Sequence, residues 1–184
     1  MDVLKPRIDG FGPNVAREAE SLWAKLNPDA AEQKSRLDQL QATLPTGNVE
    51  RGRDVFNSAK AACVTCHSIG YGGGHVGPDL TKVGSIRAER DLLESILYPS
   101  ASFAQSYEPY IAITTNGQRY DGILRRNDAD GVTLVTGPNQ ETKIARAELK
   151  ELRPGTLSIM PAGLDQQLSP QEMADLVAFL KACK

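Results

Sequence analysis

One segment in the second half of the chain has a different hydrophobic periodicity from the sequence on either side. Residues 105–153 contain short runs in which apolar and polar residues alternate, at about 107–115, 118–126, 132–136, 141–145 and 149–153. Asn116-Gly117 is a strong hairpin signal, and Gly137-Pro138-Asn139 marks another turn. These runs predict a small antiparallel β sheet or barrel inserted between two helical stretches.

The sequence on either side of this insert has helical periodicity and loops rich in glycine and proline. Helices are predicted at about 49–61, 87–97 and 170–182. Ser169 is the expected N-cap of the last helix, and Met173 lies on its apolar face, where a core role is sufficient.

The spacing of a small residue and a ring predicts a helix crossing. Gly52 and Phe56 lie four residues apart on the first of these helices, so that a second helix can approach closely at the glycine. The last helix supplies apolar partners at Leu176, Phe179 and Leu180.

Residues 1–47 form a separate region by composition. Two helices are predicted, at about 14–26 and 29–44, ended by Asn27-Pro28 and Pro45. We therefore expect two domains. Residues 1–47 are interpreted as a helical hairpin that packs on the following domain or as the remnant of a preceding domain, and residues 48–184 form the second domain.

Charge and hydropathy exclude several classes of partner. The 21 basic and 23 acidic residues leave a net charge of −2, with no basic patch for nucleic acid. The mean hydropathy is −0.35 and no long apolar run is present, so no membrane span is expected in this chain. The sequence starts without a signal peptide.

The strongest chemical signal is the run Cys63-Val64-Thr65-Cys66-His67. C-x-x-C-H is the attachment signal for a c-type haem, because two thiols one helical turn apart can each form a thioether to a vinyl group. The adjacent imidazole is then placed to bind the iron.

Two other sites use a C-x-x-C pair. A zinc site needs further ligands, and the chain offers Cys183 and His75 beyond the motif. A dithiol redox pair is typical of a βαβ pattern, which this sequence lacks. We therefore favour haem. Cys183 itself is interpreted as a free thiol, an intermolecular disulfide or an ordinary helix residue.

With these motifs in their order, the chain resembles the class I cytochrome c fold. It is more closely similar to the haem-binding domain family typical of Planctomycetes and Verrucomicrobia. The resemblance covers about residues 48–182 and rests on C-V-T-C-H at 63–67, G-P-D-L at 77–80, I-L-Y-P-S at 96–100, the T-T-N-G turn, S-I-M-P-A-G-L at 158–164 and D-L-V-A-F-L at 175–180.

The resemblance implies a mostly α cytochrome c-like domain with one haem c per chain. It makes Cys63 and Cys66 the thioether positions, His67 the proximal iron ligand and Met160 the distal ligand. The Pro78 carbonyl would accept the His67 ring N–H. His75 is the alternative sixth ligand, although Pro78 on the proximal side argues against it.

Ligation by both His67 and Met160 would leave the iron with no open position, so we expect an electron carrier and not an enzyme. The expected partner is a redox protein or a fused dehydrogenase domain, and the expected location is periplasmic or otherwise exported, with the export signal outside this chain. The alternatives are a haem enzyme or gas sensor with an open distal site, and a partner-binding module built on the insert. We expect the insert to form an independent layer beside the haem core.

Overall fold

The computed structural model describes residues 15, 18 and 30–184. The first predicted helix, at 14–26, lies outside the described residues except for Val15 and Glu18, which are helical. The second corresponds to α3 (Ala30–Thr43). The chain divides into two compact units, Met1–Ala42 and Thr43–Lys184. The domain boundary expected at 47/48 and the N-terminal hairpin stay predictions.

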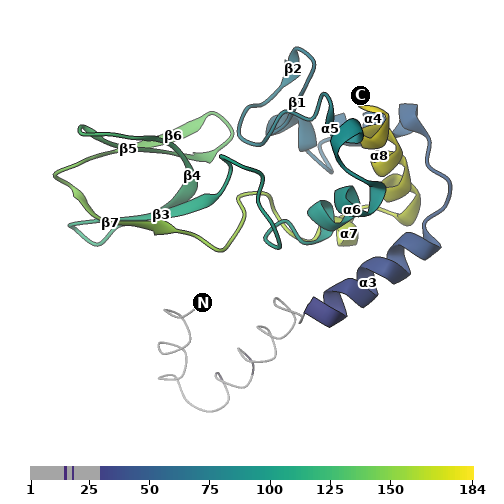
Figure 1. Ribbon diagram of the computed structural model, residues 1–184, viewed down its shortest axis with the longest axis horizontal. Coiled ribbons are helices and arrows are strands. Elements are labelled where there is room, and N and C mark those ends of the chain that lie inside the picture. The colour runs from purple at the N-terminus through teal and green to yellow at the C-terminus, as the bar shows by residue number, and fades with distance from the viewer. Residues whose placement is uncertain (1–14, 16–17, 19–29) are drawn as a thin grey trace. The chain divides into compact units, whose positions relative to one another are not determined.

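Two helices far apart in the sequence cross closely in the second unit. They are α4 (Val49–Asn57) and α8 (Pro170–Ala182), which lie together in Figure 1. A Cβ atom built on Gly52 would lie 1.9 Å from the Asp175 carbonyl oxygen, so a glycine is needed where the backbones meet. The rings of Phe56 and Phe179 pack with centroids 5.6 Å apart. The crossing predicted from Gly52 and Phe56 is present.

A buried carboxylate fixes the start of α4 against α8. Asp175 is 2% exposed and accepts hydrogen bonds from the Asn48 backbone N–H at 2.7 Å and from Arg51 Nε at 2.7 Å. Gln171 Nε2 donates to the same carboxylate at 2.9 Å. Arg51 Nη2 donates as well, at 3.0 Å. Because three residues donate to one buried charge, its desolvation is compensated locally.

The helix boundaries differ from the predicted ones where side chains compete for backbone groups. The helix predicted at 49–61 ends at Asn57, because Ser58 is extended and its hydroxyl donates to the Val55 carbonyl at 2.7 Å. Ser169 is the N-cap of the last helix, as expected, and Glu172 completes a capping box that was not predicted. The helix predicted at 87–97 is α6 (Glu89–Leu97), and two short helices were not predicted, α5 (Val83–Ile86) and α7 (Leu164–Gln167).

The insert is a five-stranded antiparallel sheet. Its strands are β3 (Pro109–Thr114), β4 (Arg119–Asn127), β5 (Gly131–Gly137), β6 (Gln140–Ala145) and β7 (Leu149–Pro154), in the order β6-β5-β4-β3-β7. In Figure 1 the sheet bends at β4, so that β5 and β6 lie over β3 and β7. The edge strands β6 and β7 do not pair, so the sheet is not the closed barrel that was one of the expected forms.

The two faces of the sheet pack against different parts of the protein. The inner face has its own core of Ala112, Val132, Leu134 and Ile144. Ile123 and Val135, which face each other across β4 and β5, belong instead to a cluster with Val76 from a loop outside the insert. We call Val76, Ile123 and Val135 the outer-face cluster. The sheet is therefore buried on both faces at this point.

The remaining regular structure is a short hairpin of β1 (Ser68–Ile69) and β2 (Gly72–Gly73), which was not predicted. Among the described residues, no helix has the length and apolar character needed to cross a bilayer.

Replacing Gly52 with alanine tests the backbone contact between α4 and α8. Alanine at an ordinary helix interior stabilises by about 1 kcal/mol relative to glycine. Here its Cβ would overlap the Asp175 carbonyl, so we expect Gly52→Ala to lower the free energy of unfolding by about 1–3 kcal/mol in denaturant titrations. Asp54→Ala, at an exposed position of the same helix, is the control and should change it by less than about 0.5 kcal/mol. A stabilised Gly52→Ala protein would contradict this contact.

The pH dependence of stability tests the Asp175 network. Hydrogen bonds from Arg51 are the main cause that holds the pKa of Asp175 at about 2, below its ordinary value of 3.8. The stabilisation is therefore complete above about pH 4 and is lost as the pH falls from about 4 towards 2. Asp175→Asn should cost about 2 kcal/mol at pH 7, and its unfolding free energy should fall less steeply over that window. Parallel pH curves for the two proteins would show that the network contributes no such stability.

Candidate haem-binding site

The Cys63–His67 run folds as one tight turn. A 3₁₀ helix, η1 (Cys63–Thr65), begins after Ala62, whose φ of 51° is in the left-handed region. The backbone N–H groups of Cys66 and His67 both donate to the Cys63 carbonyl, at 3.1 and 2.9 Å. This turn brings the two thiols and the imidazole onto a single short segment.

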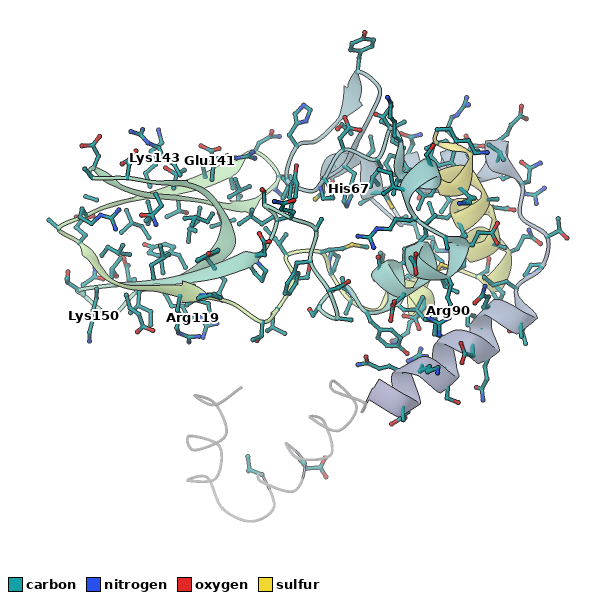
Figure 2. The ribbon with its side chains drawn as sticks, in the orientation of Figure 1. His67, Arg90, Arg119, Glu141, Lys143 and Lys150 are labelled. Carbon is teal, nitrogen blue, oxygen red and sulfur yellow. The ribbon has the colours of Figure 1, made fainter. Side chains whose placement is uncertain are left out.

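The His67 ring is held by the carbonyl that was predicted to orient it. Nδ1 of His67 lies 2.9 Å from the Pro78 oxygen, and because a carbonyl only accepts, Nδ1 is the protonated nitrogen. Burial lowers the pKa of His67, against a smaller opposing effect of this hydrogen bond. The imidazole is therefore neutral at neutral pH and keeps the Nε2 lone pair for a metal. Figure 2 labels His67 between the five-stranded sheet and the helices.

The glycines after the motif let the following loop fold directly against it. A Cβ on Gly77 would lie 2.4 Å from Cε1 of His67, and one on Gly74 would lie 2.0 Å from the Thr65 carbonyl. The Gly77 N–H donates to the Cys66 carbonyl at 2.8 Å. A larger residue at Gly77 would displace the imidazole, so this glycine shapes the cradle of the ring.

The two motif cysteines are free thiols and do not bond to each other. Burial is the main cause that raises the pKa of Cys63 to about 11, so its thiol is protonated at neutral pH. In the described part of the chain, no three His, Cys, Asp or Glu side chains converge as a metal-ion site. The side chains of Cys63, Cys66 and His67 thus do not converge on a common position where they could bind one ion, although they lie on the same turn.

The Met160 loop is fixed to the rest of the unit by its neighbours. Ile159 packs against the outer-face cluster, and so does Cys66 of the motif. The Ser158 N–H donates to Ser100 Oγ at 3.0 Å, and the Met160 N–H donates to Ser158 Oγ at 3.1 Å. Met160 is half-buried. The structure therefore brings the Met160 loop and the cysteine motif to the same apolar cluster.

His75, the alternative ligand, is exposed. Its carbonyl accepts a hydrogen bond from Arg125 Nη2 of β4 at 3.0 Å. His75 precedes Val76, which is a member of the outer-face cluster, and Pro78, which holds the His67 ring. The backbone at 75–78 is thus held close to the His67 ring, and His75 as a sixth ligand stays an untested alternative.

The insert is not the independent layer that the sequence led us to expect. Its inner face has a separate core, but Ile123 and Val135 on the other face pack with Val76, and Arg125 reaches the His75 carbonyl. The expectation is wrong at this face because, where Ile123 pairs with Val135, β4 and β5 carry apolar side chains on both faces. The signal was present in the sequence as the adjacent apolar pairs Ile123-Leu124 and Leu134-Val135, which are typical of strands buried on both sides.

Cys183, the third cysteine, is not part of the Cys63–His67 turn. It caps α8, is 9% exposed, and its Sγ lies 3.4 Å from the Phe179 carbonyl. It lines a pocket of about 500 Å³ together with Phe56 and Val64. Cys63, Cys66, His67 and Met160 do not line this pocket, but Val64 belongs to the same turn, so the pocket borders the candidate site.

Two comparisons relate the chain to cytochrome c. A family model described as cytochrome c matches residues 49–136, a range that includes the Cys63–His67 motif and Pro78 but not Met160 or α8. A curated cytochrome c of Sesamum indicum is 28% identical over 138 residues, which are 74% of this chain and 91% of that protein. Over the segment that holds the Cys63–His67 motif, the chain is therefore similar to cytochrome c.

Proposed function

We propose that this chain is a one-electron carrier with one haem c, bound covalently through Cys63 and Cys66 and ligated by His67 and Met160. The observation that supports it most directly is the contact of His67 Nδ1 with the Pro78 carbonyl, next to two free thiols on one turn. This arrangement fits a planar group better than a single ion, since the thiols and imidazole do not converge within the described residues. A haem bound there would supply an iron that accepts and releases one electron.

The residues around His67 prepare it as a ligand. The Pro78 carbonyl fixes the tautomer and the ring orientation, and hydrogen bonding at Nδ1 makes Nε2 more basic. Burial favours the neutral imidazole, so no proton has to be displaced before the metal binds. Gly77 leaves the space beside Cε1 that the ring occupies.

Met160 is proposed as the sixth ligand because its loop is fixed next to the motif and its thioether is a soft donor. Ile159 and Cys66 contact the same apolar cluster, which places the loop in the neighbourhood of the turn. Two protein ligands leave no position for a substrate, and histidine–methionine ligation raises the reduction potential. Both consequences favour electron transfer over oxygen chemistry.

The setting of the carrier is proposed from its chemistry. Because bacterial thioether attachment takes place outside the cytoplasm, we propose a periplasmic or otherwise exported location. The partner is a redox protein or a fused dehydrogenase domain. We also propose that the chain is of the type found in Planctomycetes and Verrucomicrobia.

Covalent attachment is the first test. The haem of the purified protein should remain with the chain through acid-acetone extraction, because thioether bonds survive this treatment. Cys63→Ala should leave one vinyl group unsaturated and shift the pyridine haemochrome band. Cys183→Ala is the matched control and should leave both the attachment and the band unchanged. Release of all haem from the unmutated protein would contradict the c-type site.

Met160 and His75 are compared in the second test. Met160→Ala should abolish the thioether-to-iron charge-transfer band, lower the reduction potential and allow cyanide or carbon monoxide to bind readily, because it opens the sixth position. His75→Ala should do none of these, since its side chain is exposed. Spectroscopy and redox titration measure each effect. If His75→Ala turns high-spin while Met160→Ala stays low-spin at an unchanged potential, the ligation is bis-histidine. If the unmutated protein already binds carbon monoxide at an open site, the enzyme or sensor alternative is favoured.

A further inference from the structure

The outer face of the inserted sheet contacts both segments that provide the proposed iron ligands. We propose that Ile123 and Val135 are positioning residues for both axial ligands, His67 and Met160. The inference rests on the proposed histidine–methionine site. It gives the insert a role in ligation, in place of a decoration beside the haem.

On the proximal side, four consecutive residues connect the sheet to His67. Arg125 Nη2 donates a hydrogen bond to the His75 carbonyl at 3.0 Å. Ile123 and Val135 pack against the next residue, Val76, which is 5% exposed. The N–H of residue 77 then donates to the Cys66 carbonyl, and the carbonyl of residue 78 holds the His67 ring. Moving the sheet would therefore move the backbone that orients the imidazole.

On the distal side, the same sheet holds the Met160 loop at two points. The loop leaves the sheet at Gly155, whose N–H donates to the Pro109 carbonyl at 2.7 Å at the start of β3. Four residues later, Ile159 returns to the outer-face cluster. Between these two points, the Ser158 backbone N–H donates to Ser100 Oγ. The position of Met160 therefore depends strongly on the apolar contact of the residue just before it.

The outer-face cluster thus contacts both the segment that orients His67 and the loop that carries Met160. Ile123 and Val135 are paired in register across β4 and β5, so they present one continuous apolar surface to both of these segments. They are 5% and 4% exposed, and a shortened side chain there leaves a gap that the loops can fill only by moving. A shift of the Ile159 backbone would move the neighbouring Met160 and weaken the proposed bond between its thioether and the haem iron.

Ile123→Ala is the test, and Leu134→Ala is its matched control. Both replacements remove the same number of carbon atoms from the same insert, but Leu134 is 0% exposed in the inner-face core, which contains no residue of the ligand loops. In the full-length protein with haem, Ile123→Ala should weaken the thioether-to-iron charge-transfer band and lower the reduction potential. Carbon monoxide should bind to its reduced form about tenfold faster, which corresponds to about 1.4 kcal/mol. Leu134→Ala should lower the unfolding midpoint without these changes.

Further variants keep the outcome decisive if one protein fails to fold. Ile123→Val should give a smaller change of the same sign, and Ile144→Val is its conservative counterpart in the inner core. An unchanged band, potential and carbon monoxide rate in Ile123→Ala, or equal changes in the inner-face variants, would overturn the inference while leaving the proposed carrier intact. Absence of the band from the unmutated protein would overturn Met160 ligation itself, and this inference with it.

Discussion

The second unit depends on a contact that only a residue without a side chain allows. Gly52 of α4 meets the backbone of α8 at Asp175, and Gly47 similarly meets Ala174, where a Cβ would lie 2.2 Å from the carbonyl oxygen. This proximity lets Phe56 reach Phe179 and lets Asp175 accept hydrogen bonds from three residues. Because α4 leads directly into the Cys63–His67 turn, the crossing sets where the turn begins.

The site itself combines local and distant constraints. The turn and the glycines at 74 and 77 are local, since each contacts the Cys63–His67 segment within a few residues. The Met160 loop is distant in sequence and reaches the same region through the apolar surface of the sheet. On the proposed role of Ile123 and Val135, such a site depends on a correctly folded insert, although no residue of the insert is a proposed ligand.

Many elements of the fold could be predicted from the sequence where a local residue pattern has a single structural explanation. The strand alternation and Asn116-Gly117 predicted the sheet, Ser169 predicted the start of α8, and Gly52 with Phe56 predicted the crossing. The shortened α4 was missed because Ser58 competes for the Val55 carbonyl, which helical periodicity does not report. The role of Ile123 and Val135 was missed because register and sheet bending decide which distant loop an apolar face meets.

The hydrogen bond between the Gly155 N–H and the Pro109 carbonyl has a consequence for how the chain folds. The partners Arg51 and Asp175 are 124 residues apart, and closing so long a loop is entropically costly and slow. The strands β3 to β6 pair with their sequence neighbours and can form early, and the pairing of β7 with β3 then brings Pro109 and Gly155 together. Once Pro109 and Gly155 are in contact, the residues between them no longer lengthen the loop that joins Arg51 to Asp175. The insert thus shortens the effective distance over which α8 has to find α4.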